Sequence, residues 1–404
     1  MTYDPRDPAT IQDPFPSLLW LQEHEPVHWS PILKGWILTR YDDVRATQLG
    51  KGMSADRLTP FYQSLAPEGQ TKLEDAIRFL NTWVAFKDPP EHARLRTMMN
   101  RAFSPTVVRR LDDSIEDIVR ILLQRLAGRA EFDFIADFAN PLPATVIMDL
   151  LGVDRSDMEA LREWSGWIQP FLGSSTVADN KYDLVRDGIT RMVDYFRATV
   201  ANRDPDLHDD LIADLVRRRR SGELSEDEII GTCILFLFAG HETTTNLIGN
   251  SMRALMSHPD AMADVRADHH LIAGAVEEVL RWDGPTGALV RIVTTDHERM
   301  GQRLRIGDRV FIMVNAANRD PRKFPEPDRF DIRRTPNPHL SFNTGPHFCL
   351  GAPLARSEGK IAIRRFLEAY TSVQPIGGPA EYMDTLVMRG VREMPVRVIP
   401  RIKD

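Results

Sequence analysis

A long stretch of mostly apolar sequence without proline constrains the fold of this chain more than any other feature. Ser225-Glu226-Asp227-Glu228 has the pattern of a capping box, in which the serine and the second glutamate satisfy free N–H groups at a helix start. No proline follows until Pro259. The sequence therefore predicts a helix of more than about 30 residues, about 50 Å long. Its first half is apolar on most sides, which places it through the middle of the protein.

Around this helix the sequence predicts a mainly α-helical fold with minor β structure. Apolar residues recur at three- and four-residue spacing through most of 111–259. No repeat, low-complexity tract or flexible linker interrupts the chain, so residues 1–404 are expected to form a single domain. We further expect helices starting near Asp42 and covering 261–282 and 352–370, a hairpin at 27–29 and 35–39, and strands at 289–294 and 309–314.

Composition and charge exclude several classes of protein. The net charge is −7, from 51 basic and 58 acidic side chains, which argues against general nucleic-acid binding. The most apolar segment, 229–240, is too short to span a bilayer, and the N-terminus has no signal-peptide pattern. Two cysteines, Cys233 and Cys349, make no disulfide framework. We expect a cytoplasmic monomer that binds neither membrane nor nucleic acid.

Cys349 lies in the segment F-N-T-G-P-H-F-C-L-G, directly before a predicted helix. The N–H groups and partial positive charge of a helix N-terminus stabilise a thiolate. Gly345 and Gly351 allow the backbone to approach a flat ligand closely. Taken alone, however, a free cysteine is more often a buried structural residue.

The surrounding pattern favours a ligand over a structural residue. Segment 342–351 resembles the haem-binding loop of the cytochrome P-450 family, F-G-x-G-x-H-x-C-x-G, and matches it at Phe342, Gly345, His347, Cys349 and Gly351. Asn343 stands where the family has a glycine, and asparagine tolerates unusual backbone angles better than most residues. The resemblance implies haem b (iron protoporphyrin IX), with Cys349 as the axial iron ligand and His347 against a haem propionate.

The long helix carries a second match to the same family. A-G-H-E-T-T at 239–244 resembles its oxygen-binding motif, A-G-x-[DE]-T-[TS]. Gly240, next to Ala239, leaves room above the haem, and the Thr243 hydroxyl can reach the Ala239 carbonyl and bend the helix. An acid beside a hydroxyl makes a proton relay, so Glu242 and Thr243 are the predicted catalytic residues. A zinc hydrolase would need H-E-x-x-H, but position 245 is threonine.

The resemblance extends over residues 88–351 and assigns two further groups of residues. A buried structural network is expected from Glu278, Arg281 and Arg329. Further propionate contacts are expected from His92, Arg96 and Arg291, because arginine pairs strongly with carboxylates.

The fold of the family implies where the substrate would bind. Its pocket should lie opposite Cys349 and admit an apolar organic molecule. The expected lining residues are Phe61, Trp83, Val84, Leu235, Ala239, Pro285, Ala288, Leu289, Leu386 and Val387, with the 164–172 region. Many of these side chains are equally consistent with an ordinary apolar core.

These residues together imply a haem-thiolate monooxygenase that inserts one oxygen atom from O2 into its substrate. The thiolate would favour cleavage of the O–O bond. Besides Cys349 the sequence has one cysteine, too few for an iron–sulfur cluster, and it has no G-x-G-x-x-G after a strand to indicate a flavin module. Electrons should therefore come from a separate ferredoxin and ferredoxin reductase. A basic cluster (Arg94, Arg96, Arg101, Arg109, Arg110) is a candidate docking face, with a solvated helix face as the alternative for Arg109 and Arg110. A peroxygenase or oxidative-coupling enzyme, and a non-enzymatic haem sensor, are the open alternatives.

Overall fold

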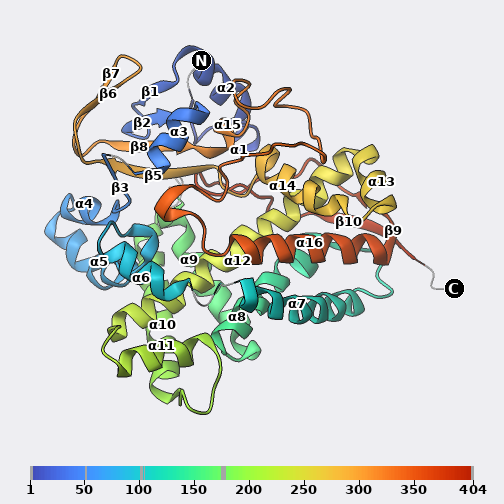
Figure 1. Cartoon of the computed structure of the whole chain (residues 1–404), viewed down its shortest axis with the longest axis horizontal. Coiled ribbons are helices and arrows are strands. Elements are labelled where there is room, and N and C mark those ends of the chain that lie inside the picture. Colours follow the sequence, from blue (N-terminus) through green and yellow to red (C-terminus); the bar gives the residue numbers. More distant parts are fainter. Residues whose placement is uncertain (1–2, 51, 101–102, 104, 174–178, 402–404) are drawn as a thin grey trace.

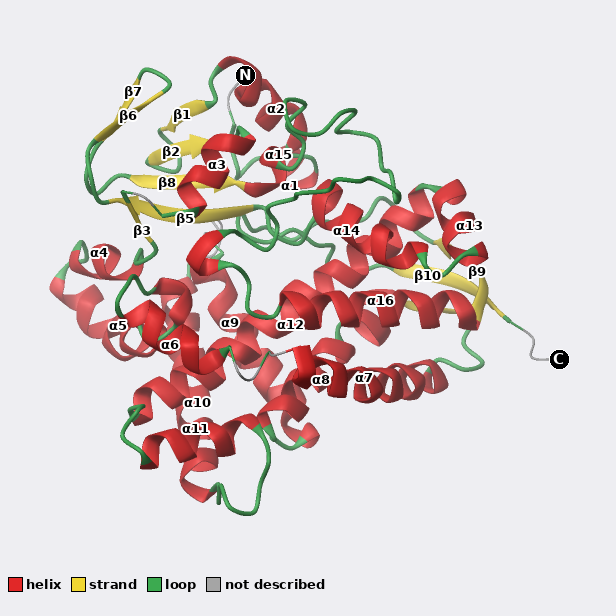
Figure 2. Cartoon of the chain, viewed as in Figure 1, coloured by secondary structure: helices red, strands yellow, loops and turns green. Residues whose placement is uncertain are grey.

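The computed structural model describes residues 3–50, 52–100, 103, 105–173 and 179–401. Helices dominate it and strands are few, as the sequence predicts, and the largest sheet lies at one side of the molecule (Figure 2). The helices of the first half are α1 (Pro8–Gln12), α2 (Phe15–His24), α3 (Tyr41–Gln48), α4 (Leu58–Gln63), α5 (Pro67–Leu80), α6 (Glu91–Met99), α7 (Pro105–Arg125), α8 (Pro141–Leu151), α9 (Met158–Leu172) and α10 (Lys181–Asn202). Those of the second half are α11 (Leu211–Arg220), α12 (Glu226–Ser257), α13 (Pro259–Ala267), α14 (Leu271–Asp283), α15 (Val314–Ala317) and α16 (Ala352–Ala369).

The strands form a mixed sheet and two smaller sheets. The mixed sheet has the order β1-β2-β8-β5-β3, in which β2 and β8 are parallel and the other pairs are antiparallel. Its strands are β1 (Val27–Ser30), β2 (Gly35–Leu38), β3 (Met53–Ser54), β5 (Ala288–Val293) and β8 (Arg309–Met313). The smaller sheets comprise β4 (Glu131–Asp133), β9 (Tyr370–Pro375) and β10 (Pro395–Pro400), and β6 (His297–Arg299) with β7 (Gln302–Leu304).

Helix α12 crosses the middle of the molecule, as predicted (Figure 1). The Ser225 hydroxyl accepts the N–H of Glu228, and the Glu228 carboxylate accepts the N–H of Ser225, which confirms the capping box. Helices α8, α10, α14 and α16 pack around α12. Because α12 is enclosed on several sides, its apolar residues are buried around much of its circumference. No helix in the described part of the chain is long and apolar enough to cross a membrane.

The prediction of a single helix over 261–282 is wrong, because two helices, α13 and α14, occupy this stretch. The break lies at Asp268, whose backbone is extended with φ −136° and ψ 100°. The Asp268 carboxylate accepts the N–H of His270 at 2.9 Å. This local bond offers the backbone an alternative to continuing the helix, which is how aspartate favours turns.

The predicted Glu-Arg-Arg network exists, but its third member is wrong. Arg281 binds the buried Glu278 carboxylate through two hydrogen bonds of 2.8 and 2.9 Å. The Nε of Arg334 reaches the same carboxylate at 3.2 Å. The Arg329 side chain is instead 62% exposed and pairs with Glu326, and only its backbone carbonyl accepts from Arg281 and Arg334. Arg334 therefore replaces Arg329 in the buried network.

The assignment of Arg334, and not Arg329, to the buried network can be tested by comparing the stability of two variants. Arg334→Ala removes a charged partner from a buried carboxylate and should lower the free energy of unfolding by about 1.5–3 kcal/mol. Arg329→Ala breaks an exposed pair and should change it by less than about 0.5 kcal/mol. Denaturant unfolding of the two variants measures both, and equal losses would contradict the assignment.

Candidate active site

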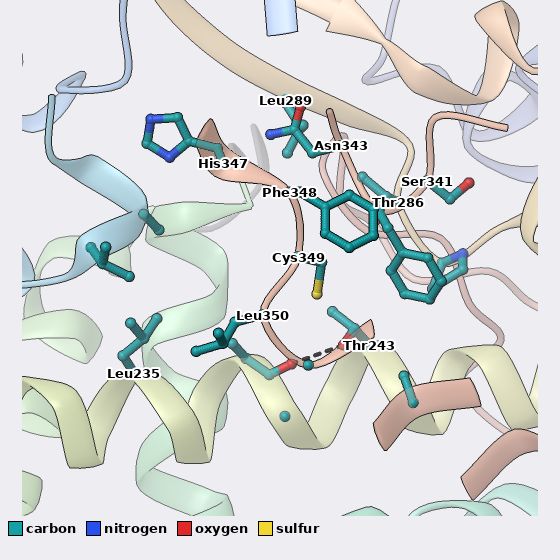
Figure 3. A pocket seen from close by; sticks show the side chains of 18 of the residues that line it. Leu235, Thr243, Thr286, Leu289, Ser341, Asn343, His347, Phe348, Cys349 and Leu350 are labelled. Carbon is teal, nitrogen blue, oxygen red and sulfur yellow. Dashed lines mark hydrogen bonds between the residues drawn. The ribbon is translucent and has the colours of Figure 1, made fainter. Parts of the chain in front are cut away.

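A cavity of ≈ 370 Å³ separates α12 from the loop that carries Cys349. Figure 3 shows Leu235 and Thr243 on α12 at one side and His347 and Cys349 on the loop at the other. The sulfur of Cys349 is directed into the space between them (Figure 3). Two motifs more than a hundred residues apart in the sequence thus face the same cavity.

The loop reaches this position through two left-handed backbone conformations, at Asn343 with φ 62° and at Gly345 with φ 68°. The Asn343 side chain accepts the N–H of Thr344 at 2.8 Å, and the N–H of Cys349 donates to the Phe342 carbonyl at 2.8 Å. Asparagine adopts this conformation more readily than most residues, which explains why it can stand at the family's glycine position. Gly345 does not line the cavity, and an added Cβ there would lie 3.1 Å from the Leu49 side chain.

The environment of Cys349 contains the donors expected at a helix N-terminus. Burial raises the pKa of the Cys349 thiol, while the N–H groups of Gly351 and Ala352 and the charge of Arg96 act to lower it. Gly351 also lines the cavity and immediately precedes α16. These groups would stabilise the sulfur as an anion, which is the form that binds metals.

A group of nitrogen-bearing side chains lines the same cavity. The rings of His92 and His347 lie 4.3 Å apart, and Arg96 and Arg291 are their neighbours along the wall. Burial lowers the pKa of Arg291 to about 10 and that of His347 to about 3. Among the described residues no carboxylate lies within ion-pair distance of Arg96 or Arg291. Buried cations are costly unless paired, so this wall fits a ligand with carboxylate arms, such as the two propionates of haem.

The α12 side of the cavity has the expected hydroxyl contact. Thr243 donates to the Ala239 carbonyl at 2.8 Å, as predicted. Gly240 lines the cavity, and an added Cβ there would come within 2.9 Å of the Ile147 side chain. The glycine therefore also permits close packing of α12 on α8.

Glu242 lies behind this surface and does not itself line the cavity. One of its carboxylate oxygens is buried and has no hydrogen-bond partner within the described chain. Burial raises the pKa of Glu242 to about 7. The carboxyl group can therefore exchange a proton near neutral pH.

Only some of the residues that were expected to line the substrate pocket do line the cavity. Val84, Leu235, Ala239, Pro285, Leu289 and Val387 line the cavity, whereas Phe61, Trp83, Ala288 and Leu386 do not. Ala288 is fully buried in an apolar cluster with Leu18 and Leu21, although the three residues that follow it on β5 all line the cavity. Residues 164–172 do not line it either.

The aromatic residues that miss the cavity have other packing partners. Trp83 is buried against Phe86 and Phe238. Phe61 packs on Phe171 and Tyr182. Leu386 lines a second, much smaller cavity. The sequence analysis missed several residues that do line the main cavity, namely Arg57, Ala85, Phe86, Phe103, Ile147 and Glu358.

A buried ion pair fixes the segment that carries Val387. Arg389 donates from Nε to Asp283 at 2.6 Å, and its backbone N–H donates to the Pro285 carbonyl at 2.9 Å. The Val387 carbonyl accepts the N–H of Gly287 at 2.8 Å. The segment 387–389 is therefore held against the segment 283–287, and Val387 is fixed in the cavity wall.

The predicted docking face is only partly consistent with the structure. Arg94 is paired with Glu228, and Arg96 faces the cavity. Arg101 and the side chain of Arg110 lie outside the described residues. Arg109 is exposed and thus remains a candidate for a partner surface.

Comparisons with known proteins agree with this geometry. The Cytochrome P450 family model matches residues 153–393. "Biotin biosynthesis cytochrome P450" of Bacillus subtilis (strain 168) is 34% identical over 96% of each chain. "Cytochrome P450 monooxygenase PikC" of Streptomyces venezuelae is 35% identical over 95% of this chain and 91% of that protein. The solved structure of CalO2 has a TM-score of 0.90 at 31% identity and covers 99% of both chains.

A helical fold with a cysteine loop and a long helix facing each other across one cavity defines the haem-thiolate class of enzymes. On the strength of these matches, the chain belongs to the cytochrome P450 family. Proteins of this family bind haem b through a cysteine thiolate and act on organic substrates with O2 and redox partners. The protein is accordingly a monooxygenase of the oxidoreductase class.

The backbone at Asn343 gives a test of the loop geometry. Asn343→Gly should leave stability nearly unchanged, because glycine adopts positive φ without strain. Asn343→Val should lower the free energy of unfolding by about 1–2 kcal/mol, because a branched side chain is strained there. Thermal unfolding of the haem-loaded proteins checks this order, and a fully stable valine variant would contradict it.

Proposed function

We propose that Cys349 is the thiolate ligand of haem b and that the cavity is the site of monooxygenation of a largely apolar organic substrate. The observation that carries this proposal is the position of Cys349 opposite Ala239 and Thr243 across one cavity. When bound, the haem would supply the activation of dioxygen. Electrons would come from a ferredoxin and its reductase, and the protein would act as a cytoplasmic monomer.

The haem would be oriented by side chains of the cavity wall. Arg96 and Arg291 would hold its propionates through their unpaired positive charge, and His92 and His347 would serve as further hydrogen-bond donors. Phe342 and Gly351 line the cavity beside Cys349, where they would contact the flat ring. These contacts would fix the ring between the cysteine loop and α12.

Protons would reach the reaction site through Glu242 and Thr243. Glu242 is a partly buried acid whose pKa is raised to about 7, so it can both hold and release a proton near neutral pH. The hydroxyl hydrogen of Thr243 is engaged by the Ala239 carbonyl, so its oxygen is free to accept a hydrogen bond from the cavity. Glu242 would supply the proton, and Thr243 would position it.

The state of Cys349 can be tested spectroscopically. The reduced protein with carbon monoxide should show the strongly red-shifted Soret band of thiolate ligation, and Cys349→Ala should abolish it. Cys233 is buried on α12 and does not line the cavity, so Cys233→Ala is the matched control and should keep the band. A band typical of histidine ligation in the wild type would refute the proposal.

The proton relay predicts a dependence of turnover on pH. The pKa of Glu242 is raised to about 7, so its carboxyl group is protonated below that pH and ionised above it. Turnover with a surrogate ferredoxin and reductase should therefore decline as pH rises through about 7. Glu242→Gln should remove this step and lower kcat by about 10²-fold. An unchanged profile in the variant, or equal turnover with peroxide alone, would favour the peroxygenase alternative.

A further inference from the structure

Arg57 is a third guanidinium group in the cavity, beyond Arg96 and Arg291. It lies between β3 and α4, where no sequence motif marks it. Burial lowers the pKa of Arg57 to about 10, and the nearby positive charge of Arg291 acts in the same direction. A desolvated cation in this position is costly unless an anion compensates it.

The protein provides no such anion for Arg57 within its described residues. Its guanidinium donates one hydrogen bond, to the Leu172 carbonyl at 2.8 Å, and lies 5.3 Å from the centre of the Phe86 ring. Of the carboxylates near it in sequence or space, Asp56 accepts backbone N–H groups at the start of α4. Asp88 accepts the Ser54 hydroxyl and the N–H of Ala55. Both carboxylates are thus engaged elsewhere.

The remaining acid in the cavity does not neutralise Arg57 either. Among the described residues that line the cavity, Glu358 is the single one with a carboxyl group. It is fully buried on α16, and burial raises its pKa well above the ordinary value, which favours the uncharged form of its carboxyl group. Haem would bring two propionates, for which Arg96, Arg291, His92 and His347 are available. Arg57 is then left as an excess cation.

The ring of Phe86 lies against Arg57, and the cavity wall also includes the apolar side chains of Ala55, Val84 and Ala85. We propose that the substrate is an organic acid with an apolar body, whose carboxylate is bound by Arg57. The planar guanidinium suits a carboxylate because two parallel hydrogen bonds can form. This inference rests on the proposed function and refines its substrate from an apolar molecule to an apolar acid.

Binding to the haem-loaded protein tests the proposal without turnover. The probes are dodecanoic acid and 4-phenylbutanoic acid, each compared with its methyl ester, and the measurement is the low-spin to high-spin shift during titration at neutral pH. At least one acid should bind tenfold or more tightly than its ester. Equal affinity of acid and ester in both pairs, or no binding of either acid, overturns the proposal.

Variants then assign the preference to one side chain. Arg57→Met should abolish the preference for the acid and leave the affinity of the ester within about threefold, and Arg57→Lys should retain part of it because it keeps the charge but not the paired donors. Arg162→Met is the matched control, since Arg162 is also partly buried with a lowered pKa but does not line the cavity. It should keep the full preference. A preference that survives Arg57→Met overturns the assignment.

Haem content and the carbon monoxide spectrum separate the competing explanations. If Arg57 instead pairs with a haem propionate, Arg57→Met and Arg57→Lys will lose haem or shift its spectrum while the acid preference of the remaining holoprotein is unchanged, which overturns the proposal. A wild type without the thiolate band means that the proposed function itself has failed. A normal thiolate band with no acid preference means that only the role of Arg57 has failed.

Discussion

The buried carboxylate of Glu278 is the group on which the position of the active site depends. It is fully enclosed, so its charge must be met by several donors at once. Arg281 comes from its own helix, while Arg334, Asn337 and the N–H of Asp331 come from the irregular chain that follows α15. Removing this chain from Glu278 would leave the buried carboxylate with Arg281 alone and several of its hydrogen bonds unmade, which costs several kcal/mol. The requirement fixes residues 331–337, and the cysteine loop begins shortly after them, at Phe342.

The two sides of the cavity are anchored by different forces. On one side α12 is held by apolar packing against the surrounding helices. On the other side the loop is held by backbone hydrogen bonds and by Leu340, whose N–H donates to Asn318 at 2.8 Å. Between them the wall carries more positive charge than the described residues neutralise. A rigid cavity wall with unpaired cations is preorganised to bind anionic ligands.

The features that could be predicted from sequence are those encoded locally. The capping box and the contact of Thr243 with Ala239 depend on residues within one or two helical turns, and the length of α12 follows from the absence of proline before Pro259. The cysteine loop could be recognised because the residues that match the family pattern lie within ten consecutive positions, 342–351. The choice of Arg334 over Arg329 could not, because both lie in irregular chain and only the tertiary path decides which side chain turns inward. Strand alternation could not predict which residues of β5 face the cavity, because Leu289, Val290 and Arg291 all line it, and Arg57 carries no local signal.

The left-handed backbone of Asn343 has a consequence for how such chains are recognised. The loop requires a torsion angle, and both glycine and asparagine can supply it. The position therefore constrains the backbone conformation more narrowly than the identity of the residue. A strict letter pattern with an obligatory glycine would overlook this chain, although its cysteine loop has the geometry that the pattern was written to describe. Motifs of this kind are better expressed as sets of residues that share a backbone conformation.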